Sequence, residues 1–109
     1  MFIARWQFTA RFGKMEDCIA ILRKWEIDVG QRMGWKPGSV RILGGFINTS
    51  ESDIEFESRF DNLTDLESAW SDRDRNPHHR EYMMQLENLV VSGTNRWSLY
   101  REARLVPAG

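Results

Sequence analysis

The chain has few of the sequence features that usually indicate a function. Its 109 residues include only one cysteine, which excludes an internal disulfide. With two histidines beside that cysteine, we expect no zinc site. The formal net charge of −1 gives no electrostatic basis for a nucleic-acid partner. No apolar run is long enough for a transmembrane helix, and the first residues do not resemble a signal peptide. We therefore expect a cytoplasmic protein that binds no metal, no nucleic acid and no membrane.

Motifs of the common enzyme classes are also missing. We find no Ser-His-Asp order, no phosphate-binding glycine loop and no nucleotide fingerprint. Gly44 and Gly45 stand inside a predicted strand, where they indicate a bulge or the close approach of a backbone or ligand. Cys18 lies among apolar residues at helical spacing, which predicts a buried structural thiol. A reactive thiol is the alternative, because its partners need not be local in sequence.

Aromatic residues are abundant instead, with five tryptophans and six phenylalanines. A chain of this size buries only about two-thirds of the surface that its unfolded form exposes. Large aromatic side chains either enlarge such a core or mark a surface that a second subunit covers. We expect a single domain over residues 1–104, followed by a loosely ordered tail over residues 105–109.

Hydrophobic periodicity predicts both strands and helices. Alternating apolar residues indicate strands at 2–8, 40–47, 54–60 and 96–102. Spacings of three and four predict a long helix at 15–33, a short one at 63–70 and a third that begins at 77. Asp61-Asn62 and Asn76 are predicted to supply N-caps, and Gly34 is a predicted C-cap. The charged stretch 72–75 is predicted to be a solvated loop, with a lid or an inter-subunit contact as alternatives.

The order strand, helix, strand, strand, broken helix, strand predicts an α+β protein of the ferredoxin-like βαββαβ type. An antiparallel four-stranded sheet would carry the helices on one face. The residues expected beneath the helices are Phe2, Trp6, Phe8, Val40, Ile42, Phe46, Ile54, Phe56, Phe60, Trp97 and Leu99.

The other face of this sheet is predicted to mix charged and apolar side chains. Its members are Ile3, Arg5, Gln7, Arg41, Leu43, Ile47, Glu55, Glu57, Arg59, Ser98, Tyr100 and Glu102. One interpretation is a solvated face crossed by weak salt bridges. The other is a homodimer interface, since apolar residues among arginine–glutamate pairs are typical of a polar buried interface. Glu55 and Glu57 could form a carboxylate pair there, although salt bridges to Arg41 and Arg59 fit them better.

One segment carries a family resemblance. The strand 56–60 is followed by Trp70, by NPHH at 76–79 and by QLENLV at 85–90. With the element order, from Phe2 to about Glu102, this pattern resembles the dimeric α/β-barrel superfamily. Within it, the nearest groups are the antibiotic-biosynthesis-monooxygenase-like and NIPSNAP-like small proteins. The resemblance implies a homodimer in which a second sheet packs on the mixed sheet face.

The resemblance implies a broad range of functions. Members include cofactor-independent oxygenases of phenolic substrates, polyketide cyclases, isomerases, and haem-binding or haem-degrading proteins. Haem-degrading relatives carry an asparagine on the first strand, where Trp6 or Gln7 stands here. The missing asparagine disfavours haem degradation, so we expect no cofactor, with haem binding as the alternative.

His78 and His79 are the candidate catalytic residues. Both are expected in the first turn of the helix that begins at Pro77, where the helix dipole disfavours imidazolium. A neutral imidazole can act as a general base. Adjacent helical side chains point about 100° apart, so the pair is not expected to share a metal. The alternative is a pair of exposed polar residues at a helix start.

A pocket between sheet and helices is predicted to bind a hydrophobic small molecule, in particular an aromatic one such as a polyketide or quinol. The candidate substrate-binding residues are Trp6, Phe56, Trp70, Tyr82 and Trp97. The protein would then be a homodimeric enzyme of the cofactor-independent monooxygenase or cyclase/isomerase type. The alternative is a non-catalytic ligand-binding, haem-binding or structural dimer with a plain aromatic core. A cavity of at least ~300 Å³ with a histidine at its wall would favour the enzyme.

Overall fold

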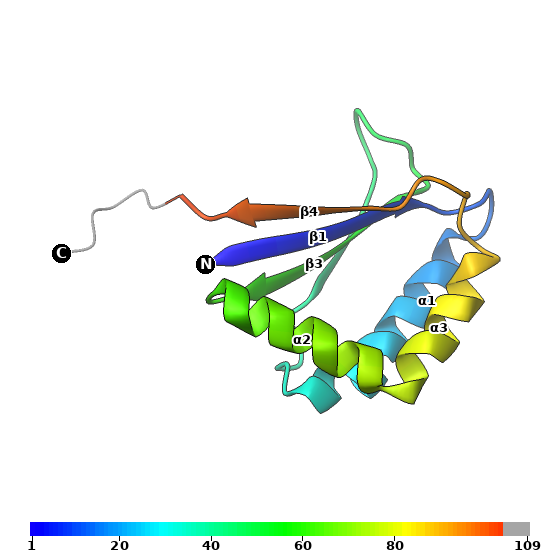
Figure 1. Ribbon diagram of the computed structural model, residues 1–109. Coiled ribbons are helices and arrows are strands. Elements are labelled where there is room, and N and C mark those ends of the chain that lie inside the picture. Colours follow the sequence, from blue (N-terminus) through cyan, green and yellow to red (C-terminus); the bar gives the residue numbers. More distant parts are fainter. Residues whose placement is uncertain (104–109) are drawn as a thin grey trace.

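The chain folds into one antiparallel sheet with helices on one of its faces (Figure 1). The computed structural model describes residues 1–103, and the predicted tail at 105–109 lies outside them. In chain order the elements are β1 (Phe2–Thr9), α1 (Met15–Trp25), β2 (Arg41–Gly44), β3 (Asp53–Phe60), α2 (Leu63–Arg75), α3 (Pro77–Glu87) and β4 (Arg96–Arg101). The strand order is β2-β3-β1-β4, so the predicted ferredoxin-like α+β fold is confirmed.

The strand register brings apolar residues of the central strands onto the helix side of the sheet. Trp6 pairs with Phe56 and Phe8 pairs with Ile54 across β1 and β3. Phe8, Ile54 and Phe56 are buried there against α1. Cys18 is also fully buried, and burial, followed by the nearby Asp17 carboxylate, raises the pKa of its thiol. The predicted structural role of this cysteine fits that environment, since the thiolate is the reactive form.

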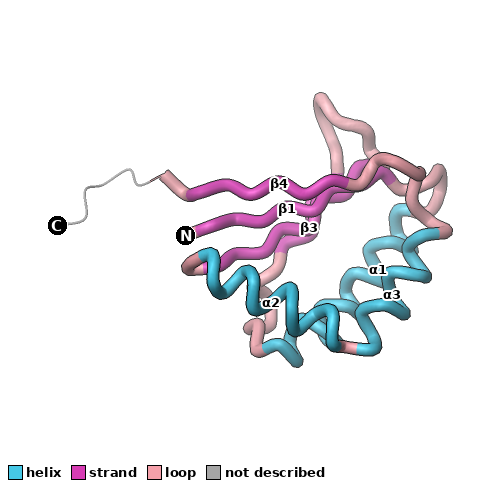
Figure 2. Tube along the Cα trace, in the orientation of Figure 1, coloured by secondary structure: helices cyan, strands magenta, loops and turns pink. Residues whose placement is uncertain are grey.

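The long helix predicted at 15–33 is present, but its winding changes along the way. After α1 ends at Trp25, the chain continues as a π-helical turn at Glu26–Gly30 and a 3₁₀ turn at Gln31–Met33. Gly34 ends the helix with φ of 91°, the left-handed C-cap predicted from sequence. Figure 2 shows the whole stretch as helix beside α3. Along residues 1–103, no helix is long and apolar enough to cross a bilayer.

Three expectations for individual segments are wrong. Stretch 72–75 is not a loop, because α2 continues through it to Arg75. Phe46 is 83% exposed, because β2 ends at Gly44 and leaves Phe46 in the following loop. Leu99 is on the predicted sheet face but is 47% exposed, because β4 is an edge strand.

Asparagine caps set the start of the two helices that follow the sheet. The Asn62 side chain accepts a hydrogen bond from the Asp65 backbone N–H at 2.8 Å, as expected for an N-cap. Asn76 accepts one from the His78 backbone N–H at 2.9 Å, and its amide donates to the Asp28 carbonyl at 3.1 Å. Asn76 therefore starts α3 and also ties it to the π-helical turn.

The face of the sheet opposite the helices holds a buried carboxylate. The Glu57 side chain is only 1% exposed, with Arg5 Nη2 at 3.0 Å and Arg41 Nε at 2.5 Å. The Arg41 hydrogen bond is the largest cause that lowers the Glu57 pKa, and Arg5 adds to it against the effect of burial. The two guanidinium groups themselves cover this carboxylate. The predicted salt-bridging role of Glu57 is confirmed with Arg41, whereas Arg5 takes the place expected for Arg59.

We expect Glu57→Gln to lower the free energy of unfolding by about 1–2 kcal/mol, because the two arginines lose a charged hydrogen-bond acceptor. Glu55→Gln is the matched control, since Glu55 lies on the same strand face with its side chain 30% exposed and only a 4.0 Å contact to Arg5. Urea unfolding at pH 7 and one fixed protein concentration measures both. Equal losses in the two variants would contradict a special role for Glu57.

Candidate functional site

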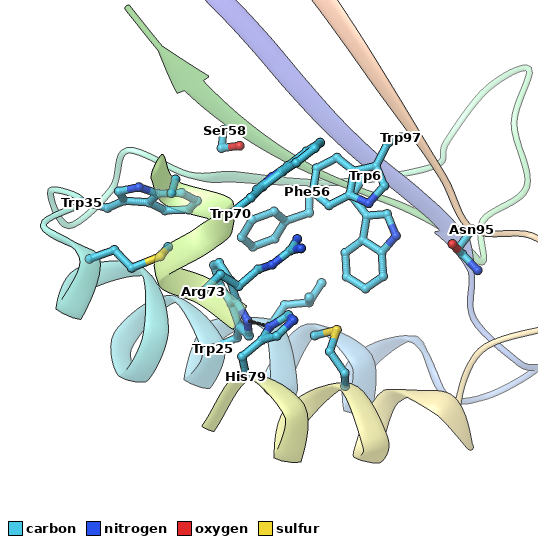
Figure 3. Close-up of a pocket in the computed structure, with 14 residues that line it drawn as sticks. Trp6, Trp25, Trp35, Phe56, Ser58, Trp70, Arg73, His79, Asn95 and Trp97 are labelled. Atoms are coloured by element: carbon cyan, nitrogen blue, oxygen red, sulfur yellow. Dashed lines mark hydrogen bonds between the residues drawn. The ribbon is translucent and has the colours of Figure 1, made fainter. Parts of the chain in front are cut away.

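All five tryptophans of the chain line one cavity between the sheet and the helices. The cavity has a volume of about 190 Å³ and is partly open to solvent. Figure 3 shows Trp6, Trp97 and Phe56 reaching it from the sheet, and Trp25 and His79 from the helices below. Among residues 1–103, its lining is Trp6, Leu22, Trp25, Met33, Trp35, Phe56, Ser58, Ala69, Trp70, Arg73, His79, Met83, Asn95 and Trp97. The aromatic residues thus surround a hollow space.

Contacts between aromatic rings hold the wall of this cavity. Trp25 packs edge-on against Phe56, with ring centroids 5.3 Å apart and planes at 88°. Trp97 stacks on Trp6 at 6.0 Å and meets Trp70 at 5.4 Å. Trp70 and Trp97 are 37% and 43% exposed, so they stand at the mouth of the cavity. These geometries are the ones that aromatic pairs prefer, which favours a wall of defined shape.

His79 is the histidine that reaches the cavity. The indole Nε1–H of Trp25 donates a hydrogen bond to His79 Nδ1 at 2.9 Å (Figure 3). The pKa of His79 is lowered from its ordinary value of 6.5, chiefly by burial and then by the Arg73 charge, with Asp74 acting in the opposite direction. The predicted neutral imidazole is therefore supported at His79, although burial and Arg73 are its main causes.

Among the described residues that line the cavity, Arg73 supplies the only charge. Its side chain extends between Trp70 and His79 into the cavity in Figure 3, and its guanidinium lies 5.5 Å from the Trp70 ring centroid. The guanidinium also contacts Asp74 at 3.2 Å, a residue that points to solvent. Ser58 and Asn95 add neutral polar groups, and no lining residue carries a carboxylate. The cavity therefore combines an apolar lining with one cation and several hydrogen-bonding groups.

Two of the predicted site residues lie outside the cavity. The His78 imidazole is 47% exposed, and its Nδ1 lies 3.6 Å from the Glu81 carboxylate. The Tyr82 hydroxyl donates a hydrogen bond to the Asp28 carboxylate, which ties α3 to the π-helical turn. The expectation that Tyr82 shapes the pocket is wrong. His78 points away because adjacent residues on a helix diverge, and α3 turns only His79 toward the sheet.

The remaining candidates are brought together, and further residues join them. Trp6, Phe56, Trp70 and Trp97 line the cavity as predicted. The lining residues that were not named as candidates include Trp25, Trp35, Arg73 and Asn95. Trp25 had a usable signal, because it belongs to the apolar stripe of the helix predicted at 15–33. Arg73 shares a helix face with Trp70 only because α2 extends to Arg75.

The size of the cavity limits what it can hold. Its 190 Å³ fall short of the expected ~300 Å³, although an apolar cavity of about 150 Å³ can bind benzene. A groove of about 590 Å³ adjoins it through Met33, Trp35, Ser58 and Ala69, and one of about 330 Å³ adjoins it through Trp6, Met83 and Asn95. One aromatic ring fits inside, and its substituents can extend into these grooves.

The size and the lining of the cavity bear on whether a haem or a metal ion could bind. The cavity alone, at about 190 Å³, is smaller than the pockets of about 300–1,000 Å³ that hold drug-sized ligands, so a porphyrin would have to extend into the adjoining grooves. Within residues 1–103, no group of three or more histidine, cysteine, aspartate or glutamate side chains is arranged to hold a metal.

Comparison with known proteins gives matches to solved structures alone. No family model matches the chain, and no curated protein matches it. A NIPSNAP family protein from Agrobacterium tumefaciens superposes with a TM-score of 0.77 at 12% identity, over 99% of this chain and 98% of its own. An uncharacterized NIPSNAP domain protein from Burkholderia xenovorans gives 0.74 at 10% identity, over 98% and 99%.

This chain shares the fold of these two proteins. A protein from Nitrosomonas europaea, named as a proposed antibiotic biosynthesis monooxygenase, shares that fold with a TM-score of 0.65 at 12% identity, over 95% of this chain and all of its own. Both groups are those that the sequence pattern resembles. At such identities the fold is what these proteins have in common, and a fold alone does not decide function.

We expect His79 to make stability depend on pH. Because the folded protein binds a proton at His79 less readily than the unfolded chain does, the free energy of unfolding falls as the pH drops below about 6.5 and is fully restored above it. His79→Gln should flatten this part of the profile, and the exposed control His78→Gln should keep it. Urea unfolding between about pH 5 and pH 8 measures this slope. That pH range lies above the one in which Glu57 changes its charge, because the pKa of Glu57 is lowered from 4.5. An unchanged slope in His79→Gln would contradict the assignment.

Proposed function

We propose that the protein is a small homodimeric enzyme that acts on an aromatic small molecule bound in the tryptophan cavity. The observation that carries this proposal is the convergence of all five tryptophans and His79 on one hollow space. A chain that used its aromatics only as core would bury them without a cavity. Here Trp70 and Trp97 stay partly exposed at the mouth, where a ligand would cover them.

The lining favours a flat, apolar ligand with one or more oxygen substituents. Indole and phenyl faces bind an aromatic ring through apolar contact and edge-to-face geometry. Arg73, Ser58 and Asn95 can hydrogen-bond oxygen atoms at its edge. Phenols, quinols and aromatic polyketides have this chemistry, with one ring in the cavity and the rest in the adjoining grooves.

Two types of reaction follow from the fold group and from this lining. In a cofactor-independent oxygenation, a ring CH₂ becomes C=O, one oxygen atom of O₂ enters the substrate and the other leaves as water with the two hydrogens. All the electrons then come from the substrate, which must first lose a proton to solvent water through the open mouth of the cavity and so form an electron-rich enolate or phenolate. In cyclisation or isomerisation, a similar anion reacts without O₂. In both, Arg73 and His79 would stabilise the anion through hydrogen bonds.

The second candidate function is a non-catalytic carrier or sensor of the same class of ligand. The small volume of the cavity favours it, because 190 Å³ leaves little room for a second reactant beside an aromatic ring. The two candidates share the ligand and differ only in turnover.

The homodimer is part of this proposal, with the mixed sheet face as its interface. The helices cover one face of the sheet and leave the other open (Figure 1). That open face carries Leu43 and Tyr100 beside the arginine–glutamate pairs. The loop at 45–52 rises on the same side in Figure 1, with Phe46 and Ile47 83% and 79% exposed. A second copy would cover these apolar side chains with its own.

Ligand binding is tested first through the tryptophans. We expect 4-methylcatechol to quench the intrinsic fluorescence, since every tryptophan lines the cavity. Trp70→Ala should weaken binding by about tenfold, the value of one aromatic contact. Phe12→Ala removes a fully exposed aromatic that lies outside the cavity and outside the proposed interface, and it should leave binding unchanged. The proposed site would be contradicted if the probe does not change the fluorescence and no aromatic compound copurifies with the protein.

Turnover is tested with the compound that mass spectrometry identifies in the natively purified protein. Incubation in air should add one oxygen atom and remove two hydrogens if the protein is an oxygenase, whereas an isomerase leaves the mass unchanged in air and under argon. We expect His79→Gln to slow either reaction at least about tenfold while binding persists. Binding without any conversion in the wild type would favour the non-catalytic candidate.

For the dimer, light scattering at micromolar concentration should give twice the mass of one chain. Ile47→Asp places an unpaired charge in the proposed interface and should raise the dissociation constant at least about tenfold. Met84→Asp is the matched control, because Met84 is a 59% exposed apolar residue on a helix away from the open face. A monomeric wild type would refute the interface.

A further inference from the structure

We propose that Trp25 is a positioning residue that holds His79 in its Nε2–H tautomer, so that His79 meets its ligand as a hydrogen-bond donor. The part of this inference that concerns a ligand rests on the proposed function, whereas the tautomer of His79 does not. Its structural part concerns two side chains of this chain, Trp25 on α1 and His79 on α3, which are 54 residues apart. It changes the role expected for His79, because an Nε2 that carries a proton cannot accept another as a general base.

The hydrogen bond itself determines the tautomer. An indole Nε1–H is a donor only and has no lone pair to accept with. The 2.9 Å bond to His79 Nδ1 therefore requires a lone pair on that nitrogen. A neutral imidazole carries its single proton on the other nitrogen, Nε2. Protonation of Nδ1 would place its N–H opposite the Trp25 indole N–H, and two donors cannot hydrogen-bond to each other. The same hydrogen bond therefore disfavours the imidazolium form of His79.

The surroundings hold both rings in place. Trp25 is 6% exposed and is packed between Phe56 and Trp35, with ring centroids at 5.3 and 5.6 Å. His79 stands in the first turn of α3, whose start is tied to the π-helical turn by the Asn76–Asp28 hydrogen bond. That turn follows Trp25 directly, so the donor and the acceptor are fixed on two segments that are themselves joined.

His79 Nε2 remains available for a ligand. Within the described part of the chain, Trp25 is the only hydrogen-bond partner of the His79 ring, and no buried side-chain nitrogen lacks a partner, so Nε2 keeps accessible surface. His79 lines the cavity together with Arg73, and no carboxylate lines it. A donor beside a cation suits a ligand that presents a hydrogen-bond acceptor, above all an oxygen anion.

The wild-type protein tests the tautomer directly. Long-range ¹H–¹⁵N correlation spectra at pH 8 should show His79 with an unprotonated Nδ1 and a protonated Nε2, the signals being assigned with His79→Gln. The Trp25 indole N–H resonance should follow the His79 titration. A protonated Nδ1, or an average of both tautomers, would overturn the inference without any variant having to fold.

Two matched variants then separate positioning from packing. Trp25→Phe keeps an aromatic ring but removes the donor, so His79 should populate both tautomers and its titration midpoint should rise by about one pH unit. The nearby charges of Arg73 and Asp74 and the neighbouring His78 stay unchanged in this variant. Trp35→Phe removes another cavity indole that packs on Trp25 and should change neither readout. A midpoint that is the same in Trp25→Phe and the wild type would contradict the role of Trp25.

Ligand probes test the donor role at Nε2. 4-Nitrophenolate and 4-nitrotoluene have similar shapes, but only the first presents an oxygen anion. We expect the phenolate to bind the wild type at least about tenfold more tightly, and His79→Gln together with Trp25→Phe to reduce that preference. Equal affinity for both probes would overturn the donor role. Failure of both probes to bind would refute the proposed ligand site while the tautomer measurement still stands.

Discussion

The hydrogen bond from the Trp25 indole to the His79 imidazole joins the three parts of the protein that build the cavity. Trp25 belongs to α1, packs its edge on Phe56 of the sheet and donates to His79 of α3. One buried side chain therefore sets the spacing between sheet and helices as well as the orientation of the imidazole. A change at this position acts on the packing of the core and on the chemistry of the wall together, since both depend on the same ring.

The sheet separates the buried carboxylate of Glu57 from the positively charged wall of the cavity. Side chains alternate along β3, so Phe56 and Ser58 face the helices while Glu57 faces the opposite side. There Glu57 is held by Arg5 and Arg41. This arrangement keeps its negative charge on the far side of the sheet. Among the described lining residues, the Arg73 guanidinium is then the only charge at the cavity wall, which favours an anionic or oxygen-rich ligand over a cation.

Much of the fold could be predicted from sequence, but only the smaller part of the cavity lining. Alternation placed Trp6, Phe56 and Trp97 on the helix face, where the structure has them. The ends of strands were less predictable, because Phe46 continues the alternating pattern although β2 ends at Gly44. Arg73 was assigned to a loop because charged residues on an exposed helix have no apolar period. Trp35 follows a helix cap and has no periodic neighbours, so nothing in its local sequence indicated the cavity.

The sequence by itself determined the order of the elements, their caps and the faces of the strands. These features depend on hydrogen bonds and side-chain spacing within a few residues, as in the Asn62 and Asn76 caps. Only the tertiary structure decided that His79 faces the cavity while His78 faces solvent, and that Trp25 is the partner of His79. Those outcomes depend on how α1 and α3 pack on the sheet, a geometry set by contacts between residues that are far apart in the chain.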